Sequence, residues 1–169
     1  MHMQSLNDLF EHEIADLQNA EMQLVEALPK LAGAASNQEL RTAFEHHLDE
    51  TRDHVRRLEE IRGQIGSSLK EECEGMKGLI AEGEETISAG GDPTVKDAAL
   101  ISAAQRVEHY EIAAYGTART LADELDLADA RELLDQTLDE ESNADKLLTK
   151  IATGGMFKAG INERAATTS

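Results

Sequence analysis

The stretch AAQRVEHYEIAAY, residues 103–115, decides the fold that this sequence predicts. It contains no proline or glycine, and at about 100° per residue Ala104, Val107, Ala114 and Tyr115 share one helical face with Ala118 just beyond it. Glu108 and Glu111 lie near the middle of that face, one turn apart. Because a buried carboxylate pair is costly without a positive partner, we hypothesise that a pair of metal ions meets it.

Apolar residues at helical spacing predict four long helices, which places the chain in the all-α class. The quoted stretch belongs to a helix that begins after Asp92 and Pro93 and ends near residue 125. The other three are expected from residue 5 or 7 to 28, from 36 or 37 to 65, and from 127 or 128 to 152. Pro29 is compatible with a kinked continuation of the first helix.

Residues 66–91 contain six glycines, and their apolar anchors recur at short intervals, at Met76, Leu79, Ile80 and Ile87. This pattern of glycines and apolar residues predicts a long, partly helical crossover. Two helical hairpins joined by such a crossover form a ferritin-like four-helix bundle. We therefore expect one domain over residues 1–153 and a flexible C-terminal tail over 154–169, which is mostly small and polar.

The composition excludes several classes of partner. The 169 residues carry a formal net charge of −18, which argues against nucleic acids and anionic membranes because no basic patch is available to collect phosphates. A well-solvated surface is the simplest interpretation of the charge, and a high-salt habitat is an alternative. Cys73 is the only cysteine, no apolar run approaches about 18 residues, and no signal-peptide pattern is present, so we expect a cytoplasmic protein.

Each of the four predicted helices carries an acidic residue on or beside its apolar stripe. Ferritin-like bundles that hold two metals use a Glu from each of two helices and a Glu-x-x-His motif from each of the other two. The predicted ligands are Glu21, His47, Glu50, Glu108, Glu111, Glu141 and Asp145. Carboxylates with one or two imidazoles favour iron or manganese, so the expected cofactors are two Fe or Mn ions.

The standard Glu-x-x-His motif is missing from the second and fourth helices. The second offers His47-x-x-Glu50 or Glu50-x-x-x-His54, and the fourth offers Glu141-x-x-x-Asp145. Two other residues could therefore take the place of one of the predicted ligands. One is His54, which by itself is more typical of a satisfied polar side chain. The other is Glu140, which lies about 90° from the centre of its apolar arc.

Several segments carry a wider resemblance. They are D-x-x-x-A-E-x-Q-L at residues 16–24, F-x-x-H-L-D-E-T at 44–51, M-x-G-L-I-x-E at 76–82, DAALI at 97–101, AAQRVEHYEIAAYG at 103–116 and L-x-E-E at 138–141. Over about residues 4–152 the chain resembles the YciE/YciF family of bacterial stress proteins. The resemblance implies a ferritin-like bundle related in fold to rubrerythrin, usually a homodimer. It also implies that Glu108-x-x-Glu111 corresponds to the two-glutamate helix of a rubrerythrin-type site.

Three functions remain open at this point. The first is a di-metal protein that handles peroxide, dioxygen or iron, and the second is a non-enzymatic stress protein whose bundle serves as a dimerisation or interaction module without metal. The third is an iron store, which requires a closed cage of many subunits. The chain has no paired cysteines of the rubredoxin type, so any electron donor would be another protein.

Overall fold

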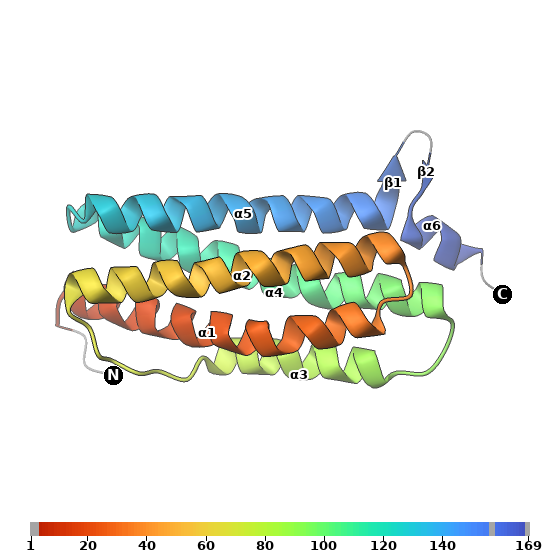
Figure 1. Cartoon of the computed structure of the whole chain (residues 1–169), viewed down its shortest axis with the longest axis horizontal. Helices are drawn as coiled ribbons and strands as arrows, with labels where there is room; N and C mark the ends of the chain where they lie inside the picture. The colour runs from red at the N-terminus through yellow and green to blue at the C-terminus, as the bar shows by residue number, and fades with distance from the viewer. Residues whose placement is uncertain (1–3, 156–157, 168–169) are drawn as a thin grey trace.

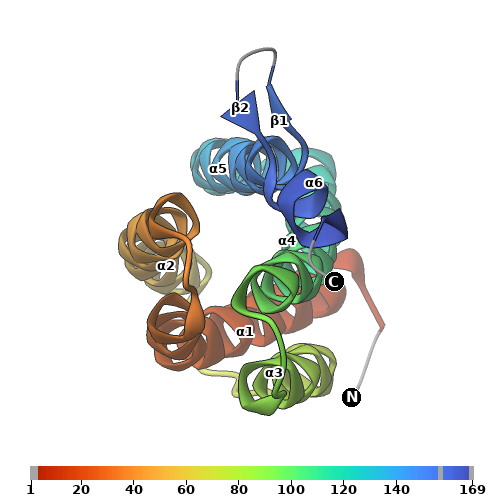
Figure 2. The ribbon, with the colours of Figure 1, turned by 90° about the vertical axis from the view of Figure 1, so that its right-hand side faces the viewer.

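The computed structural model describes residues 4–155 and 158–167, and four long helices dominate it (Figure 1). They are α1 (Leu6–Ala34), α2 (Gln38–Ile65), α4 (Pro93–Glu124) and α5 (Ala128–Thr153). The pairs α1·α2 and α4·α5 pack most extensively, so the bundle consists of two helical hairpins (Figure 2). The predicted all-α, four-helix architecture is confirmed.

Polar side chains determine where three of these helices begin. Ser5 Oγ accepts a hydrogen bond from the amide of Asp8, and the Asp8 carboxylate accepts one from the amide of Ser5. Asn37 and Asp92 each accept bonds from the amides two and three residues ahead. These caps satisfy amides that have no partner within the first helical turn.

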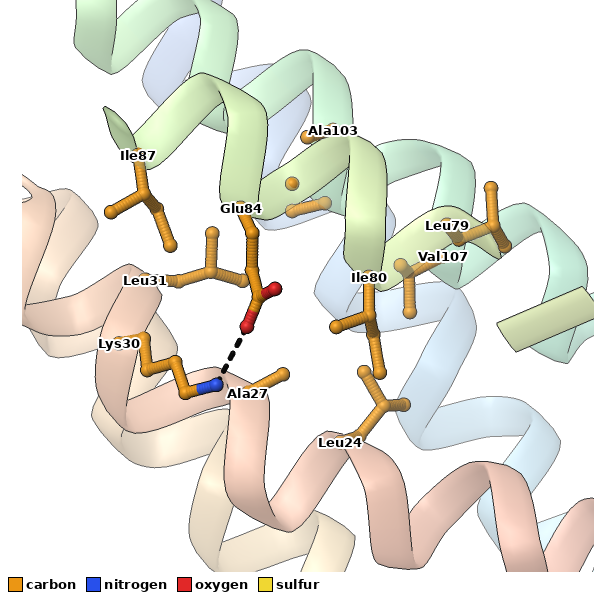
Figure 3. Close-up of a pocket in the computed structure, with 12 residues that line it drawn as sticks. Leu24, Ala27, Lys30, Leu31, Leu79, Ile80, Glu84, Ile87, Ala103 and Val107 are labelled. Carbon is orange, nitrogen blue, oxygen red and sulfur yellow. Dashed lines mark hydrogen bonds and ion pairs between the residues drawn. The ribbon is translucent and has the colours of Figure 1, made fainter. Parts of the chain in front are cut away.

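The crossover contains α3 (Glu74–Ser88), which lies outside the bundle against α1 and α4 (Figures 1 and 2). Ile80 and Ile87 point toward α1, and Lys30 Nζ of α1 pairs with a carboxylate oxygen of Glu84 at 2.6 Å (Figure 3). The pocket among these side chains measures about 20 Å³, room for about one water, so it is a packing gap rather than a ligand site. The crossover is partly helical, as predicted.

A buried carboxylate joins the turn between α1 and α2 to the first turns of α4. Asp97 is 2% exposed and accepts hydrogen bonds from the Ser36 amide at 2.8 Å, the Ser36 hydroxyl at 2.6 Å and the Asn37 amide at 2.9 Å. These bonds link the two hairpins at one end of the bundle.

The described part of the tail differs from the predicted flexible segment. It forms a two-stranded hairpin, β1 (Gly154–Gly155) with β2 (Lys158–Ala159), and a short helix, α6 (Ile161–Ala166), which packs on α4 and α5. Ile161 is fully buried. A Cβ on Gly160 would lie 2.3 Å from the carbonyl oxygen of Ala152, so only glycine allows this close approach. The domain boundary at residue 153 itself stays a prediction.

The core is divided into two apolar clusters along the bundle. One contains Leu24, Leu40, Leu100 and Leu148, and the other contains Phe10, Leu58, Tyr115 and Leu134. Each long helix contributes to both clusters and carries buried acids or histidines between them, whereas the buried Asp97 lies at the end of the bundle. The helices thus place a polar layer in the middle of an otherwise apolar interior.

Candidate metal centre

The polar layer consists of buried residues, each at most 5% exposed as a whole, that come from all four long helices. They are Glu21 of α1, His47 and His54 of α2, Glu108 and Glu111 of α4, and Glu141 of α5. Charged groups buried this deeply are costly unless they are paired or bind a cation.

The ligand atoms of this layer form two groups, in each of which they lie within 4.8 Å of one another. One group is His47, Glu108, Glu111 and Glu141, and the other is Glu21, His54 and Glu141. Glu141 belongs to both groups. A shared carboxylate between two sets of oxygen and nitrogen atoms is the arrangement that a bridged pair of ions requires.

His47 stands between the interior and the outer part of the bundle. Its Nε2 lies 3.4 Å from Glu108 Oε1 and 3.7 Å from Glu141 Oε2. Its Nδ1 lies 3.6 Å from Glu50 Oε2, on the side where the glutamate is 27% exposed. Nε2 of His47 therefore faces the buried carboxylates of Glu108 and Glu141. Nδ1 faces the more exposed carboxylate of Glu50.

His54 is oriented by a carboxylate outside the two groups. Its Nε2 lies 2.9 Å from Glu140 Oε2, and Glu140 is held by the Arg57 guanidinium, whose two terminal nitrogens donate to its two oxygens. The other ring nitrogen, Nδ1, lies 2.9 Å from Glu141 Oε1 and 3.3 Å from Glu21 Oε1. When Nε2–H donates to Glu140, the lone pair of Nδ1 faces the polar layer, as a metal ligand must.

Tyr115 supports the α1 side of the layer. Its hydroxyl donates a 2.5 Å hydrogen bond to Glu21 Oε1, and the side chain is fully buried. Burial and the neighbouring Glu21 raise the pKa of Tyr115 well above its ordinary value, so the phenol keeps its proton and remains a donor.

In the metal-free protein, protons partly offset the buried negative charge. Burial alone lowers the pKa of His47 and His54, but the carboxylates around them outweigh it and raise the pKa of His47 to about 10 and that of His54 to about 11. Burial raises the pKa of Glu108 and Glu111 well above the ordinary value. For Glu141 burial also raises the pKa, but His47 and His54 outweigh it, so the net shift is downward.

The residues present fit a metal. Within the described ranges, both carboxylate oxygens of Glu111 and of Glu141, both ring nitrogens of His47 and Nδ1 of His54 are buried without a hydrogen-bond partner. Unpartnered buried polar atoms are rare in proteins, and here they converge on one place. Their chemistry, carboxylate oxygen with two imidazoles, suits iron or manganese.

Two of the predicted ligands lie outside both groups. Glu50 lies on the outer side of His47, and Asp145 accepts a hydrogen bond from Gln105 Nε2 at 2.9 Å and lies 3.3 Å from His109 Nε2. The structure brings the other predicted ligands together and adds His54, which the sequence offered only as an alternative.

A weak signal for His54 exists in the sequence. Thr51-x-x-His54 keeps the second half of a Glu-x-x-His motif, with threonine in the position of the glutamate. Thr51 is fully buried and its hydroxyl donates to the His47 carbonyl. In the two groups of ligand atoms, α2 contributes no carboxylate, whereas α4 contributes two, those of Glu108 and Glu111.

None of the described helices is both long enough and apolar enough to cross a membrane. The family model described as "Domain of unknown function (DUF892)" matches residues 5–166. The Escherichia coli K12 protein YciF is 43% identical over 165 residues, which cover 96% of this chain and 99% of that protein.

Two solved structures are similar over most of the chain. The crystal structure of the E. coli stress protein YciF has a TM-score of 0.84 and 39% identity, covering 98% of this chain and 100% of the other. YcfI of Rhodopseudomonas palustris, described provisionally as a structural protein, has a TM-score of 0.85 and 39% identity, covering 88% and 96%.

Proposed function

The chain belongs to the DUF892 family, whose model matches residues 5–166, and we propose that it is a stress-associated protein whose bundle holds a carboxylate-bridged pair of Fe or Mn ions. His47, Glu108 and Glu111 would hold one ion, Glu21 and His54 the other, and Glu141 would bridge them. Such a pair, when bound, would supply redox chemistry toward peroxide or dioxygen, including the oxidation of ferrous iron by either of these oxidants.

The protein's own residues contribute positioning and exclusion of water. Tyr115 holds Glu21 in place, and Arg57 through Glu140 holds the ring of His54. The two apolar clusters on either side of the polar layer limit access of water. A dry, fixed set of ligands is what a redox-active metal pair requires of its protein.

One observation carries this proposal. Glu141 is fully buried, belongs to both groups of ligand atoms, and has neither oxygen engaged in a hydrogen bond within the described part of the chain. A carboxylate in that position costs much free energy unless positive charge lies on both of its sides.

A second candidate function is a stress protein that binds no metal and whose bundle serves as a dimerisation or interaction module. The observation in its favour is the 2.9 Å approach of His54 Nδ1 to Glu141 Oε1. With both histidines protonated, imidazolium–carboxylate pairs by themselves offset part of the buried charge. A protonated imidazole cannot ligate a metal, so metal binding at this residue requires the loss of its proton.

Metal analysis separates the two candidates. Protein purified without chelator and loaded anaerobically with Fe²⁺ should contain about two ions per chain by mass spectrometry. Glu141→Ala and Glu108→Ala should lose most of that metal, whereas Glu132→Ala, at an exposed position of α5, should keep it. Wild-type protein that takes up no iron would refute the metal site and leave the interaction module as the better proposal.

Two further measurements define the activity and the assembly. Consumption of peroxide by loaded protein would distinguish an enzyme from a metal binder, with the electrons supplied by an external donor. We also propose a homodimer, which a sizing column tests. A dimer would exclude an iron store, because a mineral core needs a closed cage.

A further inference from the structure

A cavity between α2 and α5 leads toward the candidate metal centre. Its volume is about 100 Å³, and its polar lining includes exposed His46, half-buried Glu50 and buried Glu108. On the α5 side it is lined by Asn143, Ala144 and leucines. A space of this size holds about three waters, which is enough for a partly hydrated ion.

A small side chain on α5 leaves this space open. Ala144 lies three residues after Glu141, the position where the Glu-x-x-His motif places a histidine. An imidazole there would project into the region that the cavity occupies, whereas a methyl group does not. The missing histidine of α5 thus coincides with an opening beside the inner carboxylates.

Potential ligand atoms follow one another along the cavity. His46 Nδ1 lies 3.2 Å from Glu50 Oε2, Glu50 Oε2 lies 3.6 Å from His47 Nδ1, and His47 Nε2 lies 3.4 Å from Glu108 Oε1. Side-chain exposure falls along this series from 69% to 27%, 7% and 3%. Among the residues that the structure describes, neither His47 Nδ1 nor Glu108 Oε2 has a hydrogen-bond partner, and both atoms are buried on side chains that line this cavity.

The His54 side of the polar layer carries a positive charge instead. There the Arg57 guanidinium, 14% exposed, binds both oxygens of Glu140, and Glu140 Oε2 pairs with the outer nitrogen of His54, Nε2. A fixed positive charge repels an approaching cation, whereas the α2–α5 cavity presents carboxylates and imidazoles and no lysine or arginine.

We propose that the α2–α5 cavity is the path by which a divalent cation reaches the inner ligands, and that His46, Glu50 and His47 Nδ1 form an outer binding station on it. This inference rests on the proposed metal centre. Glu50 supplies the negative charge of the station, and the two imidazoles supply nitrogen ligands. Rotation of the exposed His46 and half-buried Glu50 side chains passes the ion to His47, whose other nitrogen faces Glu108.

The rate of metal uptake tests this path. Co²⁺, whose ligand-field absorption reports on coordination, is mixed with metal-free protein in a stopped-flow instrument. Glu50→Gln should slow uptake at least roughly tenfold relative to Glu45→Gln, which removes the same charge from an exposed position of α2 outside the cavity. Ala144→Leu, which fills the cavity and removes no ligand, should also slow uptake and leave the final amount of bound Co²⁺ unchanged.

The results of this uptake experiment distinguish a failure of the proposed path from a failure of the proposed metal centre. Uptake by Glu50→Gln and Ala144→Leu at the rate of Glu45→Gln, with normal final occupancy, would overturn the path and leave the metal centre standing. If those variants take up Co²⁺ normally but react slowly with peroxide after loading, the cavity admits a neutral oxidant and the cation path is refuted. Wild-type protein that binds no Co²⁺ would overturn both proposals.

Discussion

At the scale of single residues, the orientation of the His54 ring decides whether a nitrogen ligand faces Glu21 and Glu141. His54 directs Nδ1 toward Glu21 and Glu141 because its Nε2 pairs with Glu140, which Arg57 holds in turn. A partner of this kind fixes both the ring and the nitrogen that carries the proton.

Replacing Glu140 with glutamine should therefore weaken metal binding without removing a proposed ligand. We expect the affinity of Glu140→Gln for Fe²⁺ or Co²⁺ to fall by about 10- to 100-fold in a competition titration with a chelator. The neighbouring exposed Asp139→Asn serves as the control. Equal affinities for the two variants, with unchanged far-ultraviolet circular dichroism, would show that Glu140 does not position the ring.

Metal binding should also depend on pH in a defined direction. The ordinary pKa of histidine is 6.5, and the surrounding carboxylates raise the pKa of His47 to about 10 and that of His54 to about 11 in the metal-free protein. Both rings are therefore protonated at pH 7 and must each lose a proton to ligate.

We expect uptake of metal near pH 7 to release at least about two protons per chain, and the affinity to rise with pH up to about 10. Titration in buffers of different ionisation enthalpy measures the released protons. A pH-independent affinity between 6 and 9 would contradict the proposed role of both histidines.

At the scale of secondary structure elements, the helices are held in register by a few polar contacts as well as by apolar packing. One of them is the contact of Asp97 in α4 with the turn between α1 and α2, which ties the helix of Glu108 and Glu111 to the helix of Glu21. The apolar clusters alone are less specific, because leucines and alanines pack in more than one register.

Removing this carboxylate should destabilise the protein strongly. Asp97→Ala removes a buried carboxylate and leaves the amides of Ser36 and Asn37 without their acceptor, and we expect the free energy of unfolding to fall by about 3 kcal/mol. Urea denaturation measures the change. Asp139→Ala, at an exposed position, should change it by less than about 0.5 kcal/mol, and a similarly small effect of Asp97→Ala would refute the role of this contact.

At the scale of the whole molecule, the polar layer interrupts what would otherwise be one continuous core. All four long helices contribute ionisable side chains to this layer, and burying such side chains costs free energy. A ligand that binds the folded state and not the unfolded chain stabilises the fold by mass action.

Metal should therefore raise the melting temperature. At a free metal concentration of about 100 times Kd we expect about 2.7 kcal/mol of stabilisation, or roughly 5–10 °C for a chain of this length. Differential scanning calorimetry with Mn²⁺ or Fe²⁺ measures the shift, and a chelator should reverse it. The shift should be absent in Glu141→Gln, and the same shift in that variant would place the metal elsewhere.

The sequence by itself determined the four helices, their hairpin pairing and the partly helical crossover. It also placed Glu21, Glu108, Glu111 and Glu141 on buried faces. The helices and their buried faces follow from local periodicity, because residues three or four apart share a helical face whatever the helix packs against. The hairpin pairing follows from the long crossover between the second and third long helices.

Only the tertiary structure decided which side chains of different helices meet. It left Glu50 and Asp145 outside both groups of ligand atoms, brought His54 into one of them, and packed Ile161 against the bundle. The physical reason is that such contacts depend on the rotation and level of each helix relative to its neighbours. Packing of the whole core and the Asp97 contact set that geometry, and neither is encoded in the periodicity of any single helix.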